Sequence, residues 1–190
     1  MYKIATHNSA TGEAPVDIFH YIVVPFTRNQ SKTISQQIDA GVRMFDLRVK
    51  KYNGQYHSGH GLFTTKRSFE DITRQINNVS GRVYATITYE GRLCSKQEIN
   101  EFYDYVRYIT ICYNHIIWGD VAVKYTNNDL IVDWLVIQKA DNRYVESESK
   151  FLALDGKNWQ SYIPIPWLWK KIYYDKPVFN NDKFTYIDFL

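Results

Sequence analysis

Hydrophobic and polar residues alternate most regularly in an eight-residue run that begins at Val42. A period of two residues is that of a β-strand, whose side chains point alternately to its two faces. One face of this strand carries Phe45, Leu47 and Val49, and the other carries Asp46 and Arg48. The same alternation returns at residues 83–90, so two half-polar strands are predicted in the first half of the chain.

Between and after these strands the apolar positions take a helical spacing. Thr33 with Gln36, and Ser95 with Glu98, have the spacing of capping boxes, which start helices. Ser68 is a further helix-starting residue, placed just before an apolar stripe of helical period. The predicted helices span residues 34–40, 69–80 and 96–109.

The remaining patterns complete an alternation of strands and helices. Asn53-Gly54 is a hairpin signal that predicts a turn and a returning strand at 56–61. Residues 10–30 contain Gly12, Pro15 and Pro25 and are expected to form a long loop. Further strands are expected at residues 1–7, 116–125, 130–139 and 184–190. Strands that alternate with helices predict a single α/β domain over residues 1–190, with a largely parallel sheet.

The composition excludes some classes of function but does not point to a single one. The chain has 190 residues, 16% of them aromatic, and a formal net charge of +3. That charge is too small to argue for nucleic-acid binding. The first residues lack the apolar stretch of a signal peptide, so a cytoplasmic location is expected unless a leader was removed. The two cysteines have neither the spacing of a metal site nor that of a disulfide framework.

Residues whose side chains could take part in catalysis lie at the predicted carboxyl ends of strands. His7 with Asn8, Asp46 with Arg48, and Glu90 all have such positions. In parallel α/β barrels the active site lies at this end, so these groups are expected to converge. His60 follows on the hairpin, and Asp188 lies near the end of the last strand. Each residue taken alone could instead be a packed or solvated side chain, or half of a surface ion pair.

The order of these motifs resembles a known family. The residues that carry the resemblance are Thr6-His7-Asn8-Ser9, the run from Gln36 to Arg48, and His60-Gly61. They are similar to the catalytic X region of phosphatidylinositol-specific phospholipases C, and residues 84–90 are similar to the next strand of that region. The resemblance covers residues 1–95, with a weaker match at 186–189. It implies an irregular TIM-type (β/α) barrel, which is small because such barrels typically need about 250 residues.

The resemblance also implies a phosphodiesterase mechanism. His7 would be the general base that activates a neighbouring hydroxyl, and His60 the general acid for the leaving oxygen. Arg48 would clamp the phosphate with two hydrogen bonds, and Asp46 would orient and charge-balance either Arg48 or the attacking hydroxyl. Asp188 would hold the tautomer of His7. The product would be a cyclic phosphate.

The resemblance leaves open whether the site needs a metal ion, because the family has both metal-free and calcium-dependent members. Asn8, Asp46 and Glu90 stand where calcium-dependent members bind Ca²⁺, and all three offer oxygen donors. Arg48 replaces the fourth ligand and would compete with a cation. We therefore expect no metal cofactor, with Glu90 paired to Arg48, and keep Ca²⁺ as the alternative.

Other residues receive weaker assignments. His57 is expected to be a solvated hairpin residue, and His20 and His115 receive no role. Lys139 is a candidate for substrate binding, although a solvated lysine at a strand end is the competing interpretation. Residues 159–169 hold three tryptophans and could touch a membrane surface transiently, but core packing is the preferred interpretation.

The predicted substrate is a phosphodiester with a head group of the phosphatidylinositol type. The same chemistry would act on a nucleotide or cyclic-nucleotide signal with a free 2′-hydroxyl, and a non-catalytic barrel that binds head groups is a third possibility. A glycerophosphodiester phosphodiesterase ranks lower, because those enzymes carry a Glu-x-Asp metal pair where this chain has Asp46-Leu47-Arg48. The oligomeric state stays open.

Overall fold

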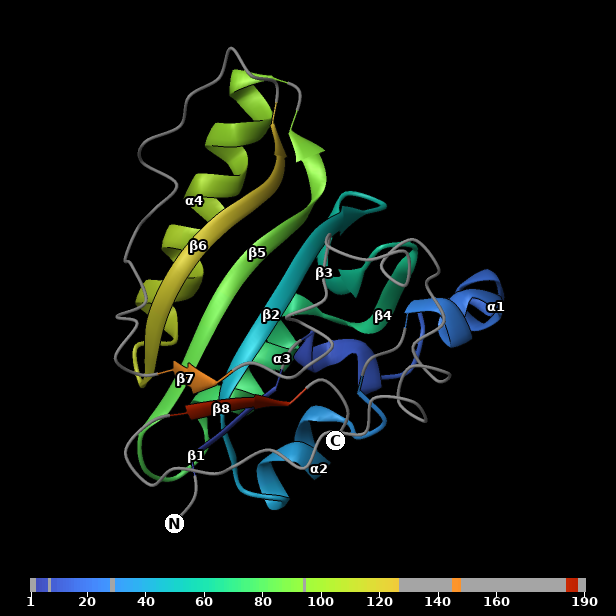
Figure 1. Ribbon diagram of the computed structural model, residues 1–190. Coiled ribbons are helices and arrows are strands. Elements are labelled where there is room, and N and C mark those ends of the chain that lie inside the picture. The colour runs from blue at the N-terminus through green and yellow to red at the C-terminus, as the bar shows by residue number, and fades with distance from the viewer. Residues whose placement is uncertain are drawn as a thin grey trace.

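The computed structural model describes residues 3–6, 8–27, 30–93, 95–126, 145–147 and 184–187 (Figure 1). Strands and helices alternate along most of this length. The strands are β1 Lys3–Thr6, β2 Val42–Tyr52, β3 Gln55–His60, β4 Phe63–Ser68, β5 Val83–Leu93, β6 Ile116–Thr126, β7 Val145–Ser147 and β8 Phe184–Ile187. The helices are the 3₁₀ helix η1 Ser9–Gly12 and the α-helices α1 Ile18–Thr27, α2 Ile34–Asp39, α3 Phe69–Asn77 and α4 Lys96–Cys112.

The described strands form one eight-stranded sheet. Six of them are parallel neighbours in the order β6-β5-β2-β1-β8-β7. The last described strand, β8, therefore lies beside the first, β1, as a barrel topology requires. Among the described residues no pairing joins β6 to β7, so the sheet is open there. The predicted α/β fold with a parallel sheet is confirmed, whereas closure into a TIM-type barrel is not.

Strand β2 is the centre of this arrangement because three strands pair with it. Strand β5 runs along one edge of β2, and β1 covers the start of the other edge. Val49 pairs with Tyr89 of β5 and also with Ser58 of β3. Strand β3 of the β3–β4 hairpin therefore pairs with the later part of the same edge of β2, beyond the residues that pair with β1. The residues that follow β1, the middle of β2 and the hairpin are thereby brought to one place.

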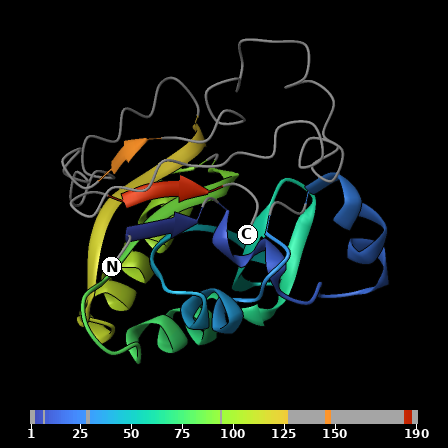
Figure 2. The same cartoon turned by 60° about the horizontal axis from the view of Figure 1, so that its bottom comes forward.

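The main core lies between the sheet and helices α2, α3 and α4, which Figure 2 shows on one side of the curved sheet. Phe45, Leu47 and Val49 of β2 are completely buried there, against apolar residues of all three helices such as Ile34, Ile72 and Phe102. The alternate residues of β5 from Val83 to Tyr89 belong to the same core. The predicted apolar faces of both strands are therefore confirmed, and the opposite face is left for polar chemistry.

The capping signals are also confirmed. The Thr33 hydroxyl accepts the Gln36 backbone N–H while the Gln36 side chain accepts the Thr33 N–H, and Ser95 with Glu98 forms the same reciprocal pair. Ser68 caps α3 by accepting the N–H of Asp71. These bonds satisfy backbone donors that the first turn of a helix cannot satisfy itself.

Residues 10–30 were wrongly predicted to be a loop, since they contain η1 and α1. Helix α1 begins at Ile18 because the Asp17 carboxylate accepts the backbone N–H of His20 at 3.1 Å. An aspartate in this place compensates the unpaired donors of the first turn. In Figure 1, α1 lies at the outer edge of the molecule, beyond β4 and away from the other helices.

Element boundaries differ from the prediction in three further places. Strands β2 and β5 continue past the predicted ends to Tyr52 and Leu93, so Asp46, Arg48 and Glu90 lie within strands and not at their ends. Helix α3 ends at Asn77, before the predicted stop at Gly81. Strand β4 was not predicted, and the predicted strand at 130–139 lies outside the described residues. Across the described helices, none combines the length and apolar character needed to cross a membrane.

Candidate active site

The centre of the site is the Arg48 guanidinium, which lies between two carboxylates. Its Nε donates to Asp46 Oδ2 at 2.9 Å and to Oδ1 at 3.1 Å, and its Nη1 donates to Glu90 Oε1 at 2.9 Å. Asp46 and Arg48 share one face of β2 by the two-residue period. Arg48 pairs with Thr88 of β5, so Glu90, two residues further on the same face, is within reach. The predicted pairing of Glu90 with Arg48 is thus present.

This triad is largely shielded from solvent. The side chain of Glu90 is 1% exposed, that of Asp46 7% and that of Arg48 19%. Burial on its own would lower the pKa of Arg48, but the charges of Asp46 and Glu90 and their hydrogen bonds outweigh it and raise that pKa. The guanidinium therefore stays charged and is held in a fixed plane, as an anion-binding group requires.

The chain leaving β1 is fastened to this triad. Asn8 is buried in a left-handed backbone conformation (φ 48°), and its N–H donates to Asp46 Oδ2 at 3.2 Å. Asparagine tolerates this conformation better than most residues. A second support comes from Gln37 of α2, whose amide accepts from the Thr6 hydroxyl at 2.8 Å and donates to the Ser9 carbonyl at 2.7 Å. The segment on both sides of His7 is thereby anchored.

Sequence reasoning missed Gln37, although a signal was present. It lies on the buried side of a short amphipathic helix, three residues after the fully buried Ile34. A polar side chain on a buried helix face needs specific partners. A buried polar residue of this kind, close to a candidate catalytic motif, is therefore a sign that its side chain holds the motif in place.

His60 reaches the same region from the hairpin. It is the last residue of β3, and Gly61 follows in a turn with φ 56°. The Gly61 N–H donates to Glu90 Oε2 at 3.5 Å, and the Gly61 carbonyl accepts from Lys50 Nζ at 3.0 Å. The turn that carries His60 is therefore bonded to Glu90, the carboxylate that also holds Arg48.

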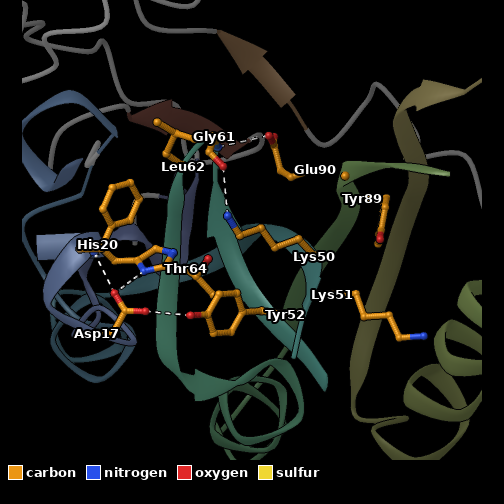
Figure 3. A pocket seen from close by; sticks show the side chains of 12 residues that line it. Asp17, His20, Lys50, Lys51, Tyr52, Gly61, Leu62, Thr64, Tyr89 and Glu90 are labelled. Atoms are coloured by element: carbon orange, nitrogen blue, oxygen red, sulfur yellow. Dashed lines mark hydrogen bonds and ion pairs between the residues drawn. The ribbon is translucent and has the colours of Figure 1, made fainter. Parts of the chain in front are cut away.

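A cavity of about 620 Å³ opens beside Glu90 and this turn (Figure 3). Its walls include Lys50 and Tyr52 of β2, His20 of α1, and Asp17, which directly precedes α1. Asp17 Oδ1 lies 2.7 Å from His20 Nδ1, and Asp17 Oδ2 accepts from the Tyr52 hydroxyl at 2.8 Å. The bonds from His20 and Tyr52 lower the pKa of Asp17 to about 2. His20, which received no role from the sequence, is thus a buried and oriented wall of the cavity.

The other two described histidines lie elsewhere. His57 was predicted to be solvated, and this is wrong, because it is buried with Nδ1 3.0 Å from the Thr65 carbonyl oxygen. The β3–β4 pairing, which the sequence did not reveal, covers it. The Nε2 atom of His115 lies 2.9 Å from the carbonyl oxygens of Val79 and Gly81, near the end of α4 and outside the triad.

Several predicted site residues lie outside the described residues, namely His7, Asp188, Lys139 and residues 159–169. Their roles remain predictions. The strand pairing nevertheless brings the neighbours of two of them together, since Thr6 of β1 and Ile187 of β8 are partners in register. His7 and Asp188 are the residues that follow these two in the sequence.

The carboxylates of the triad are poorly suited to a cation. Asp46 is engaged by Arg48 and by the N–H of Asn8, and the two oxygens of Glu90 are engaged by Arg48 and Gly61. A Ca²⁺ ion that used Asn8, Asp46 and Glu90 would have to displace a guanidinium of the same sign. Within the described ranges, no cluster of three or more histidine, cysteine, aspartate or glutamate residues is arranged to hold a metal ion.

The parallel α/β fold is similar to that of solved phosphatidylinositol-specific phospholipases C. A mutant form of the enzyme from Staphylococcus aureus matches with a TM-score of 0.52 at 11% identity, over 98% of this chain and 84% of that one. A pentafluorophenylalanine-containing form of it matches with a TM-score of 0.50 at 12% identity, over 98% and 85% of the two chains.

A further match is the phosphatidylinositol-specific phospholipase C from Listeria monocytogenes, with a TM-score of 0.45 at 15% identity. It covers 65% of this chain and 51% of that one, so the chain spans about half of the Listeria enzyme. No family model and no curated protein matches the sequence. The similarity to the Staphylococcus aureus structures establishes the fold.

Proposed function

We propose that this protein is a phosphodiesterase that cleaves phosphatidylinositol-type head groups through attack by a neighbouring hydroxyl. The observation that carries the proposal is the Arg48 guanidinium, fixed by Asp46 and Glu90 beside the turn of His60 and next to an open cavity. A rigid, shielded guanidinium can stabilise the charge that develops on phosphoryl oxygens. The phospholipase C fold supports the same reaction class.

In the proposed reaction His7 takes the proton of the substrate hydroxyl next to the phosphate, and that oxygen attacks phosphorus. The bond from phosphorus to the leaving alcohol breaks, and His60 gives this alcohol its proton. Arg48 binds the phosphoryl oxygens throughout. The products are a cyclic phosphodiester and an alcohol. Asp188 would orient His7, and Lys139 would contact the head group.

The experiment that tests the function compares three substrates for the same protein. Phosphatidylinositol vesicles, a soluble inositol phosphodiester and a cyclic nucleotide would be incubated with it, and phosphorus NMR would follow the products. We expect a cyclic inositol phosphate from the first two substrates. Turnover of the nucleotide alone would assign the site to nucleotide signals, and binding of inositol phosphates without turnover would indicate a non-catalytic barrel.

The first prediction concerns metal ions. Turnover should survive exhaustive treatment with a chelator such as EGTA, because the triad already balances its carboxylates with Arg48. The measurement is the rate before chelation, after chelation, and after Ca²⁺ is restored. A protein that stops on chelation and recovers with Ca²⁺ would contradict the metal-free mechanism.

A lipid substrate requires access to a membrane surface, and α1 offers an apolar one. Ile18 is 83% exposed, Ile22 66% and Phe19 57%, and Phe19 and Leu62 line the mouth of the cavity. Monomeric proteins seldom leave such groups of large apolar side chains exposed without a use. We propose that α1 and the Leu62 turn, rather than only residues 159–169, contact the lipid surface transiently, since they border the cavity itself.

The second prediction tests this contact. Changing Ile18 and Ile22 to Asp should lower turnover of vesicles by about 10-fold or more, because burying a charge in place of an apolar side chain weakens interfacial binding. Turnover of a soluble diester should stay within about twofold. Ile111→Asp is the matched control, because Ile111 is 64% exposed on α4. Equal losses on vesicles and on the soluble substrate would rule out a lipid-specific role.

A further inference from the structure

Lys50 lies on the same face of β2 as Arg48, two residues further along, and has no part in the mechanism described so far. Its side chain crosses the hairpin that carries His60. The Nζ atom donates to the carbonyl of Gly61 at 3.0 Å. A Cβ atom added to Gly59 would lie 2.9 Å from Cε of Lys50 and 3.1 Å from Cδ. Lys50 therefore packs over Gly59 and bonds to Gly61, the two residues that flank His60.

Glu90 holds the same turn from a second direction. Its Oε2 accepts the Gly61 N–H at 3.5 Å while its Oε1 binds Arg48 at 2.9 Å. Figure 3 shows Lys50 and Glu90 both directed at Gly61, with one bond to each side of its backbone. The carbonyl and the N–H of one residue are thus fastened to two different strands of the sheet.

The glycines are what make this arrangement feasible. A side chain at Gly59 would collide with the stem of Lys50 and would lie 2.4 Å from the Phe63 carbonyl oxygen. Gly61 adopts φ 56°, a conformation that glycine reaches without strain. The pattern Gly-His-Gly therefore gives a lysine stem room to lie against the hairpin and lets the turn close directly after His60.

We propose that Lys50 and Glu90 are positioning residues that lock the His60 turn at a set distance from Arg48. This inference rests on the proposed function, in which His60 donates a proton at the phosphate that Arg48 binds. General acid catalysis requires the acid within hydrogen-bond reach of the leaving oxygen, so a displacement of about 1 Å has large effects on the rate.

Lys50 is held in this place although burial disfavours its charge. Burial lowers the pKa of Lys50, and the charge of Glu90 partly opposes this.

The test is Lys50→Met, with Lys51→Met as the matched control. Lys51 is on the opposite face of β2, where its ammonium binds Glu101 at 2.8 Å, and Figure 3 shows it pointing away from Lys50. We expect Lys50→Met to lower kcat about 10- to 100-fold with little change in KM, because the acid is displaced while phosphate binding is kept. Lys50→Arg should restore part of kcat, since it retains a charged donor.

One measurement does not depend on turnover. Hydrogen exchange of the Gly61 amide should be faster in Lys50→Met than in the wild type, because the turn loses the bond from Lys50 to the Gly61 carbonyl. The exchange should not change in Lys51→Met. If the wild-type protein proves inactive on every diester but the Gly61 amide exchanges faster in Lys50→Met, the proposed function fails and the positioning inference stands.

The positioning inference itself would be overturned by either of two results. One is a Lys50→Met protein whose Gly61 amide exchanges at the wild-type rate. The other is an active protein in which Lys50→Met raises KM and leaves kcat unchanged, since Lys50 would then act on substrate binding. If Lys50→Met does not fold, Lys50→Gln, which keeps a polar side chain but cannot supply the charge, serves the same comparison.

Discussion

Replacing His60 with alanine is expected to lower turnover of a soluble phosphodiester by about 10²- to 10⁴-fold, the usual contribution of a general acid or base. Without it the leaving alkoxide must depart without a proton. His7→Ala should cause a loss of the same order, because the attacking hydroxyl would keep its proton. The two histidines titrate in opposite senses during the reaction, so the wild-type rate should follow a bell-shaped pH profile.

The measurement is kcat on the soluble diester, accompanied by a thermal unfolding curve for each variant. His115→Ala is the control, because the His115 ring lies against the carbonyl oxygens of Val79 and Gly81, outside the triad, and the variant should retain full turnover. A loss of only a few-fold in either His60→Ala or His7→Ala, in a folded protein, would be incompatible with the acid–base assignment.

Arg48→Lys should lower turnover by about 10²- to 10³-fold, as the loss of a preorganised electrostatic group does in other enzymes. The guanidinium reaches Asp46 through Nε and Glu90 through Nη1 while keeping one plane. A single ammonium cannot span both carboxylates and also present two parallel donors to a phosphate. The assay is kcat and KM for the soluble diester. Near-normal turnover in Arg48→Lys would show that a point charge is sufficient.

The same triad makes Arg48 important for stability. Arg48→Met would leave Asp46 and Glu90 shielded from solvent without their cation, and breaking a buried ion pair in this way typically costs about 3–5 kcal/mol. Urea unfolding at pH 7 measures the change. The loss should shrink at lower pH, where the carboxylates of the variant can take up protons.

Arg74→Met provides the comparison for a surface ion pair. Arg74 binds Glu70 and Asp71 on α3 with a side chain that is 54% exposed. Exposed pairs contribute about 0–1 kcal/mol. If Arg48→Met and Arg74→Met lower the free energy of unfolding by equal amounts, burial of the triad does not make its ion pairs more important for stability than a surface pair.

The strand faces that carry Asp46, Arg48 and Glu90 were predictable because strand periodicity is a local property. Each β2 residue of odd number from 45 to 49 faces the helices, so its neighbours face the site. The capping boxes at Thr33 and Ser95 are local in the same way, since each involves residues three apart. The family-like order of the motifs then indicated which polar face carries the chemistry.

Helix α1 shows where this reasoning fails. Pro25 within the helix, with Gly12 and Pro15 before it, suggested a loop. The bond from the His20 N–H to Asp17 nevertheless starts a helix, and contact with β4 places this helix at the cavity. The Asp17–His20–Tyr52 network joins α1 to the end of β2 across more than thirty positions of sequence. No local pattern encodes such a pairing, because it depends on which elements the tertiary fold brings together.

The sequence by itself determined the secondary-structure alternation, the polar faces of β2 and β5 and the residue types of the site, because these follow from side-chain periodicity and capping within a few residues. Only the tertiary structure decided that Glu90 also holds Gly61, and that Lys50 reaches the turn of His60. Those contacts join β2, β5 and the hairpin, whose approach is set by strand pairing and by burial of the shared core.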